Sequence, residues 1–561
     1  MTVFKALLKV LVFGGIVLFF AGCENAALVA SYTLSFNGNG ANGGNGPANI
    51  VISGGQYATV PGRGTPNGGL VKTGYYFKNW NTSPGGTGMT VRPGQSVQLN
   101  SDTVLYAQWE LGSADKTFWV RDLSDNWYTI EAKKLGEGDK CIVYGDILES
   151  DAATTENAAS VVAQYETSSG IYDKITGTFG DIKDVDSNGK VIFLLLDIID
   201  GYDPGAPDGG YVAGYFDPIH MYINSSYSNR ADMLFLDVNP GEPDYTNQES
   251  KTFYSTIAHE LQHLINFSQT AAASPPKAEK DIWINEGLST GAEAIYDPLD
   301  KSRIDYFNND PVSTIAYGNN FFVWDGYWEQ EYGDVLADYS TAYLFFQWLR
   351  IHANGTEIYK DIIAHQSGDF NAVLASAKLK ISSITSSWTW GDLLRTWMIA
   401  NAKNASTGLE GYKTELPLSP TVWSMRAGSR GGKSWAFSPG EGIFSEGSTL
   451  PGSNSGNIEY QQITGSSYSF VAGSPPYTSR SLVLTYNVNT NYRGSDESGY
   501  LTSVQDSASR SAGNYSPPIK APPQGPYPVS FGDKAAGLDR PAGGRTGRGV
   551  AIPGDKTKQV N

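Results

Sequence analysis

The chain has 561 residues, a length that suggests roughly two to four domains. Its hydrophobic content of 40% is ample for globular cores, and its formal net charge of −17 argues against nucleic acid as the main partner. The chain contains two cysteines, Cys23 and Cys141, and so small a number excludes a disulfide framework.

The N-terminal segment 1–22 has the pattern of a secretory signal peptide. Lys5 and Lys9 precede an apolar run over residues 10–20, and Ala-Gly-Cys23 follows. This junction resembles the lipobox of bacterial lipoproteins, which implies cleavage before Cys23 and lipidation of its thiol. A lipid anchor would place the protein in the bacterial cell envelope, extracytoplasmic or at the cell surface. The alternatives are an ordinary signal peptide or an uncleaved membrane anchor, although the apolar run is short for a membrane span.

Residues 31–110 form a distinct module. Short stretches with alternating apolar and polar residues, separated by turns rich in Gly and Asn, predict a small all-β fold. The stretches that carry the pattern are 32–36, 57–61, 73–80 and 103–109. Together they resemble one copy of the internalin-type B repeat, also called the Listeria–Bacteroides repeat. The resemblance implies a surface module that acts as a spacer or a binding unit, and we expect a stalk beneath the next domain.

Residues 115–405 predict a larger α+β domain, with strands first and helices later. Stretches 191–197, 210–216 and 231–238 predict a mostly antiparallel sheet. We expect the last of them to line a cleft, where an extended peptide would pair with its backbone. Residues 155–173 predict one helix, and Cys141 is expected as a single buried thiol in a strand.

The stretch 184–189, Asp-Val-Asp-Ser-Asn-Gly, resembles the opening of a calcium-binding loop. An EF-hand would need glutamate at position 195, where the chain has leucine. We therefore expect a tight turn into the following strand, with Ca²⁺ binding as the alternative.

The stretch 256–267 contains the pattern His-Glu-x-x-His. On a helix, His259 and His263 stand one turn apart on the same face. Two imidazoles at that spacing can bind one Zn²⁺, with Glu260 beside the open position of the metal. Glu260 is then the general base that activates water for peptide-bond hydrolysis. The opposite face is apolar, as a buried helix requires, and carries Ile257, Leu261, Leu264 and Ile265.

A third ligand is needed, because catalytic zinc takes three protein ligands and a water. Glu286, in Trp-Ile-Asn-Glu-Gly-Leu, is the best candidate. Pro275 and Pro276 end the first helix and let the chain double back, and small residues on the second helix would allow a close approach. Glu293 is the rival, but it lies two turns further along the helix. We expect it to support a ligand or to lie at the surface.

The helix pair resembles the gluzincin clan of zinc metallopeptidases. Over about 115–405 the chain is closer to one branch, the hyicolysin family of secreted bacterial neutral metallopeptidases. The resemblance implies a zincin-type fold and a zinc endopeptidase acting on proteins or peptides. It also implies that one Zn²⁺ is bound by His259, His263 and Glu286, with Glu260 catalytic. By analogy with the aminopeptidase branch, Tyr339 would donate a hydrogen bond to the developing oxyanion.

The rest of the chain contains fewer candidate site residues. Four helices are expected, at 338–351, 356–366, 370–378 and 387–403. Three further histidines are expected to be solvated, namely His220, His352 and His365. Residues 406–500 predict a small β-rich domain. Residues 501–561, rich in Gly, Pro and Arg, predict a disordered tail.

Two functions stay open at this point. One is a surface-anchored zinc endopeptidase; the other is a cell-surface adhesin or binding lipoprotein with a catalytically inactive zincin scaffold. The intact set of metal-binding residues together with Glu260 favours the enzyme, because an inactive site has no need of the base.

Overall fold

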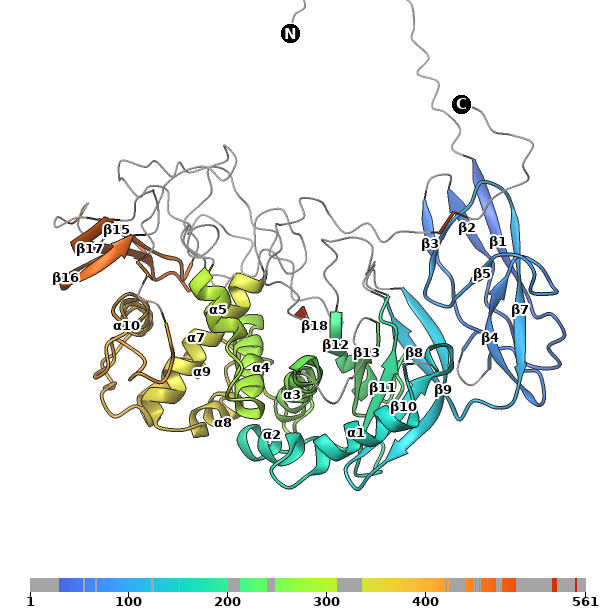
Figure 1. Ribbon diagram of the computed structural model, residues 1–561, viewed down its shortest axis with the longest axis horizontal. Helices are drawn as coiled ribbons and strands as arrows, with labels where there is room; N and C mark the ends of the chain where they lie inside the picture. The colour runs from blue at the N-terminus through green and yellow to red at the C-terminus, as the bar shows by residue number, and fades with distance from the viewer. Residues whose placement is uncertain are drawn as a thin grey trace, which may run out of the picture.

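The computed structural model describes most of the chain from residue 30 to residue 490. The described residues are 30–53, 56–65, 68–122, 126–150, 152–199, 212–239, 248–309, 335–418, 421–422, 439–446, 450, 454, 456–470, 477–490, 527–531 and 550–551. The expected lipidation site, Cys23, lies outside these residues, as does most of the expected tail. In Figure 1 the N-terminal β module lies at one end, the helices near the middle and a small C-terminal sheet at the other end.

The N-terminal module is all-β, as its alternating stretches predict. Its strands are β1 (Ser31–Asn37), β2 (Ile50–Ser53), β3 (Tyr57–Thr59), β4 (Tyr75–Asn81), β5 (Thr90–Val91), β6 (Ser96–Gln98) and β7 (Thr103–Leu111). Five of them form a sheet in the order β2-β1-β7-β4-β5. Its core is built around Trp80, which is fully buried and donates its indole N–H to the Pro61 carbonyl at 2.8 Å.

The module packs against the next domain. The Arg63 guanidinium forms an ion pair with Glu131, and both side chains are mostly buried. Thr129 donates its hydroxyl to the Gly64 carbonyl at 3.0 Å, and Thr59 donates to the Asp122 carboxylate at 2.7 Å. A cavity of about 540 Å³ lies at this junction. The expected stalk is therefore in contact with the domain that it precedes.

The central sheet has seven strands in the order β18-β12-β13-β11-β10-β9-β8. Their bounds are β8 (Lys116–Arg121), β9 (Trp127–Glu137), β10 (Cys141–Asp146), β11 (Val191–Leu196), β12 (Val212–Phe216), β13 (Met233–Asp237) and β18 (Tyr527–Phe531). The pairings β10–β11 and β11–β13 are parallel and the others are antiparallel, which confirms a mostly antiparallel sheet. The free thiol of Cys141 is buried in β10, as expected.

β11 separates two hydrophobic clusters. Its six residues, Val-Ile-Phe-Leu-Leu-Leu, are all buried, as is usual for a central parallel strand. Because side chains alternate along a strand, Phe193 packs with the helices on one face and Leu194 packs with β8 and β9 on the other.

The expectation that residues 231–238 pair with a peptide is wrong. β13 lies inside the sheet, between β11 and β12, and it forms backbone pairs with both. A peptide can add only to an edge whose backbone groups are free.

The helices surround one face of the sheet and extend beyond it. They are α1 (Thr155–Glu166), α2 (Ile171–Phe179), α3 (Gln248–Gln269), α4 (Ile282–Tyr296), α5 (Ser302–Asn309), α7 (Val335–Ala353), α8 (Glu357–Ala364), α9 (Phe370–Lys380) and α10 (Trp390–Lys403), with short 3₁₀ turns η1 (Ile147–Glu149) and η2 (Pro218–Met221). The last four confirm the predicted helices, while the single helix expected at 155–173 is wrong. The chain breaks there at Ser169, which has a φ of 61°, and at Gly170.

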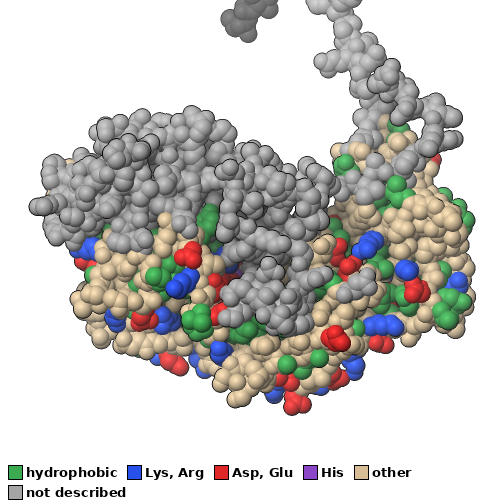
Figure 2. All heavy atoms as spheres, in the orientation of Figure 1, with side chains coloured by type: hydrophobic (Ala, Val, Ile, Leu, Met, Phe, Trp, Pro, Cys, Tyr) green, Lys and Arg blue, Asp and Glu red, His purple; other side chains and the backbone are tan. Residues whose placement is uncertain are grey.

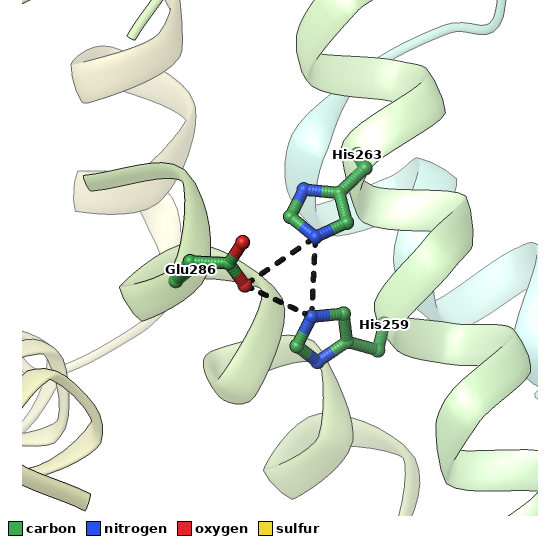
Figure 3. Close-up of side chains that lie close together, drawn as sticks. All are labelled: His259, His263 and Glu286. Carbon is green, nitrogen blue, oxygen red and sulfur yellow. Dashed lines mark hydrogen bonds and ion pairs between the residues drawn. The ribbon is translucent and has the colours of Figure 1, made fainter. Parts of the chain in front are cut away.

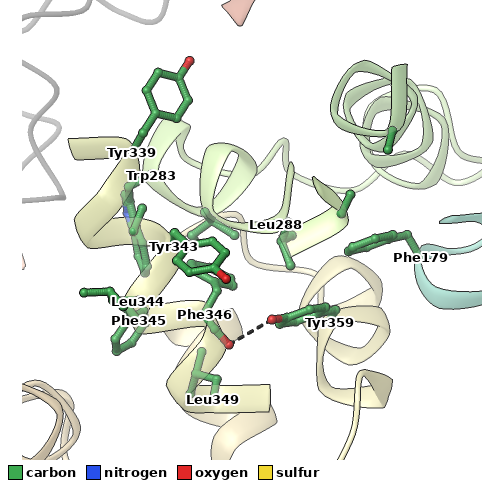
Figure 4. Packing of buried hydrophobic residues seen from close by; sticks show 14 of the residues in the cluster. Phe179, Trp283, Leu288, Tyr339, Tyr343, Leu344, Phe345, Phe346, Leu349 and Tyr359 are labelled. Atoms are coloured by element: carbon green, nitrogen blue, oxygen red, sulfur yellow. Dashed lines mark hydrogen bonds between the residues drawn. The ribbon is translucent and has the colours of Figure 1, made fainter. Parts of the chain in front are cut away.

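α4 packs closely against α3 and α7, and Tyr359 of α8 lies beside it (Figure 4). The small residues of α4 are expected to let it approach α3, and the two helices do lie in close contact, with the Ser289 hydroxyl hydrogen-bonded to Gln262 and to His263 Nδ1 on α3.

The two glycines of α4, however, face α7 and α8. A Cβ at Gly287 would collide with the Phe346 ring, and one at Gly291 would lie 3.2 Å from Tyr359. Tyr359 also donates its hydroxyl to the Phe346 carbonyl at 3.0 Å.

The C-terminal sheet contains β14 (Thr421–Val422), β15 (Gly442–Glu446), β16 (Ile458–Phe470) and β17 (Tyr477–Asn487). Phe444, Leu482 and Leu484 belong to the same hydrophobic cluster as the helices, so this sheet shares their core. A two-residue strand, β19 (Val550–Ala551), pairs with β6.

Charges of both signs are interspersed over the described part of the face in Figure 2. Pairs such as Lys78–Glu110, at 2.6 Å, are about half exposed and contribute little, on the order of 0–1 kcal/mol each. The buried clusters therefore carry most of the stability. Among the described helices, none has the length and apolar character that crossing a bilayer demands.

Candidate metal centre

Three donor atoms from two helices converge in the interior (Figure 3). His259 and His263 extend from α3, and Glu286 extends from α4. The two Nε2 atoms lie 3.1 Å apart, and the Glu286 Oε2 lies 3.3 Å from His259 Nε2 and 3.5 Å from His263 Nε2. All three residues are at most 1% exposed. The sequence-predicted ligands therefore meet at one point.

This triangle fits a zinc ion. Two atoms bound to one tetrahedral zinc at about 2.0–2.1 Å lie roughly 3.4 Å from each other, close to the observed separations. Two imidazole nitrogens and one carboxylate oxygen are also the donor set of many catalytic zinc sites. The residues present therefore fit one Zn²⁺.

α3 is held so that its metal-binding face points away from the sheet. Ile257, Leu261, Leu264 and Ile265 are fully buried in the hydrophobic cluster shared with the sheet, as their spacing predicts. Thr256 lies against Gly214 of β12, where a Cβ would come within 3.0 Å of the threonine methyl group. The close approach of helix and strand needs a glycine at that position.

α4 is tied to α3 beside the metal ligands. The Asn266 side-chain amide donates to the Asn285 side-chain oxygen in the buried space between the helices. Trp283 is fully buried one turn before Glu286. These contacts fix the position of Glu286 along the axis of α3. Its carboxylate therefore lies opposite the two imidazoles.

Glu293, the rival ligand, lies behind the metal-binding triangle. Its Oε1 is 2.6 Å from His259 Nδ1, so the carboxylate can accept a hydrogen bond from the ring N–H that faces away from Glu286. The Arg303 guanidinium donates to both of its carboxylate oxygens, at 3.2 and 3.3 Å. Burial opposes ionisation, but the charges of Arg303 and His259 outweigh it and lower the pKa of Glu293 to about 2. Its expected supporting role is confirmed.

Glu260 is fully buried next to the triangle. Within the described residues, neither of its carboxylate oxygens has a hydrogen-bond partner. Burial and the charge of Glu286 raise the pKa of Glu260 well above its usual value. A buried carboxylate with free lone pairs and a raised pKa is suited to taking up a proton.

Tyr339 also lies at this centre. It is fully buried on α7, and its ring centroid is 6.2 Å from that of His259. Burial and the nearby charge of Glu286 raise the pKa of Tyr339 well above its usual value. Its hydroxyl therefore stays protonated and can act as a donor, while its role in the reaction stays a prediction.

Sequence reasoning missed Arg303. It lies at the start of α5, outside the two helices of the metal motif, and no local pattern marks it. The chain turns back after α4, and this turn brings Arg303 on α5 next to Glu293.

Two of the histidines expected in solvent are buried instead. His220 is 1% exposed and accepts the Asn229 backbone N–H at Nδ1, and burial lowers its pKa to about 3. His352 is 5% exposed, and its Nε2 lies 2.8 Å from the Gly411 carbonyl. Both rings therefore serve packing. His365 is half-buried.

The stretch 184–189 forms the expected tight turn. Asp184 accepts backbone N–H groups from Asn188 at 3.1 Å and from Gly189 at 2.9 Å. Carboxylate oxygens of Asp184, Asp186 and Asp232 lie within 4.8 Å of one another, and Asp232 is buried. Calcium binding at this turn stays a prediction.

Comparisons with known proteins agree with both halves of this picture. Residues 32–108 match the family model of the Listeria-Bacteroides repeat domain. The chain is similar to the neutral metalloprotease ShpI of Staphylococcus hyicus, with 34% identity over 238 residues. That region is 42% of this chain and 51% of the relative, so the chain spans about half the length of ShpI.

A solved structure, native yeast LTA4 hydrolase, aligns with 62% of this chain and 54% of its own. The TM-score is 0.30 and the identity is 12%. A likeness of that size does not define a shared fold.

Proposed function

We propose that this protein is a zinc-dependent metalloendopeptidase that hydrolyses peptide bonds in proteins or peptides. The observation that carries the proposal is the buried triangle of His259, His263 and Glu286, with Glu260 beside it. The similarity to a neutral metalloprotease supports the same activity.

The chemistry follows from the residues around the triangle. Zinc, when bound, supplies a Lewis acid that activates water and polarises the scissile carbonyl. Glu260 accepts a proton at its carboxylate and passes it to the leaving amine. The Tyr339 hydroxyl donates a hydrogen bond to the carbonyl oxygen as negative charge develops there. Burial of the site strengthens both interactions, because the local dielectric constant is low.

Glu260→Gln tests the proposal with the least change of shape. We expect the variant to keep one zinc ion per chain and to lose roughly 10²–10⁴-fold in the rate of casein and peptide-library cleavage. Glu286→Gln should lose zinc as well as activity, because it removes a ligand charge. If zinc-loaded wild type and Glu260→Gln are equally inert, the endopeptidase proposal fails and the alternative of a binding protein on an inactive zincin scaffold is favoured.

We also propose that the protein is anchored in the bacterial cell envelope by a lipid on Cys23. The support is the sequence alone, with Lys5 and Lys9 before an apolar run and Ala-Gly before the cysteine. Two acyl chains hold a protein on a membrane far more firmly than one. When cells are grown with a labelled fatty acid, the wild-type protein should become labelled. The Cys23→Ser variant should stay unlabelled and appear in the medium. Unlabelled wild type in the medium would refute the anchor.

A further inference from the structure

We propose that Arg303 is a positioning residue that links the metal ligand His259 to Tyr339. The inference rests on the proposed zinc site and adds to it a single buried cation that orients two parts of the centre. Arg303 lies on α5, Glu293 on α4 and Tyr339 on α7, so the link joins three helices.

The first contact is with the carboxylate that orients His259. The Arg303 Nη2 lies 3.2 Å from Glu293 Oε1, and its Nε lies 3.3 Å from Oε2. A guanidinium that engages both oxygens fixes the plane of a carboxylate as well as its position. Since Oε1 also lies 2.6 Å from His259 Nδ1, fixing that plane fixes the imidazole ring. The opposite nitrogen, Nε2, is then directed at His263 and Glu286.

The second contact is with the tyrosine. The Arg303 guanidinium carbon lies 5.0 Å from the centroid of the Tyr339 ring, over its face. A cation over an aromatic face is attracted to the ring electrons, and the attraction is stronger away from water. Tyr339 is 0% solvent-exposed, so water does not weaken this attraction. The guanidinium therefore holds the ring against the centre while its N–H groups hold Glu293.

An arginine suits this position for a physical reason. Its flat guanidinium can use its edge for a carboxylate and its face for an aromatic ring at once, whereas a lysine ammonium cannot. Arg303 is 7% exposed and Glu293 is 6% exposed, so each would be costly to bury without the other.

Arg121 offers a matched control elsewhere in the domain. It is also buried, it forms an ion pair with Asp217 at 2.9 Å, and its guanidinium carbon lies 4.9 Å from the Trp127 ring centroid. Replacing either arginine by methionine removes one buried ion pair and one cation–aromatic contact. The two substitutions therefore differ in which carboxylate and which ring they release.

The experiment compares Arg303→Met, Arg303→Lys and Arg121→Met with wild type. The zinc dissociation constant is measured by competition with a chelator. kcat and KM are measured at saturating zinc, and the melting temperature is measured on the metal-free protein. We expect Arg303→Met to weaken zinc binding by roughly 10–100-fold and to lower kcat with little change in KM. For Arg303→Lys, both zinc affinity and kcat should lie between those of wild type and Arg303→Met. Arg121→Met should lower the melting temperature and change zinc affinity and kcat less than about twofold.

Equal zinc affinity and kcat in wild type and both Arg303 variants would overturn the inference and leave the proposed function standing. The same would follow if Arg121→Met reproduced every effect, since the role would then be structural. If Arg303→Met does not fold, Arg303→Lys carries the comparison. A wild type that binds no zinc would overturn both proposals. A wild type that binds zinc without cleaving peptides would overturn the activity alone.

Discussion

Replacing Gly287 by alanine should destabilise the protein although alanine is the better helix former. Inside a helix, alanine gains up to about 1 kcal/mol over glycine. At Gly287, however, a Cβ would lie closer to the Phe346 ring than the 3.0 Å that real Cβ atoms keep. Phe346 is fully buried and is packed against Trp283, Phe345 and Tyr359, so it has little room to move.

Overpacking of this kind costs about 1–3 kcal/mol, which leaves a net loss of up to about 2 kcal/mol. Gly287 also follows the metal ligand Glu286, so a shift of α4 should weaken zinc binding. The assay is urea unfolding of metal-free protein, with zinc affinity measured alongside.

Gly177→Ala is the control. Gly177 is an exposed glycine of α2, and a Cβ there meets nothing within 4 Å. This substitution should stabilise the protein by about 0.5–1 kcal/mol. If Gly287→Ala proved as stabilising as Gly177→Ala, a steric conflict with Phe346 would be excluded.

Three further predictions follow from buried charges. Glu293→Gln should weaken zinc binding by roughly 10–100-fold in a chelator titration, because a neutral amide orients His259 less firmly; an unchanged affinity would contradict that role. Arg63→Met should cost about 3–5 kcal/mol in urea unfolding, because it leaves Glu131 buried and unpaired, and a second change, Glu131→Met, should recover most of the loss. Burial raises the pKa of Asp146 to about 7. Since the folded state then holds the proton more tightly, stability should fall by up to about 1.4 kcal/mol per pH unit as the pH rises from about 4 to about 7. Asp146→Asn should abolish that slope, and a variant that keeps it would exclude Asp146 as the cause.

Much of the metal centre could be predicted from sequence because it depends on local periodicity. One turn of helix separates His259 from His263 whatever surrounds them, and the apolar stripe on the opposite face decides which side is buried. The all-β pattern of the N-terminal module and the four later helices follow from similar short-range rules.

What the sequence left undecided depends on contacts between distant segments. β13 is an inner strand because β11 and β12 pair with it from either side. Its apolar run is typical of a buried strand, but the run does not say which strands pair with it. His220 packs against Trp127 and Phe235 from two strands of the sheet. His352 lies beside the Gly411 carbonyl from a later segment.

Glu293 meets His259, and Arg303 meets both Glu293 and Tyr339, because α3, α4, α5 and α7 pack together. Helical periodicity specifies the face on which a side chain lies, but tertiary packing alone decides what that face meets.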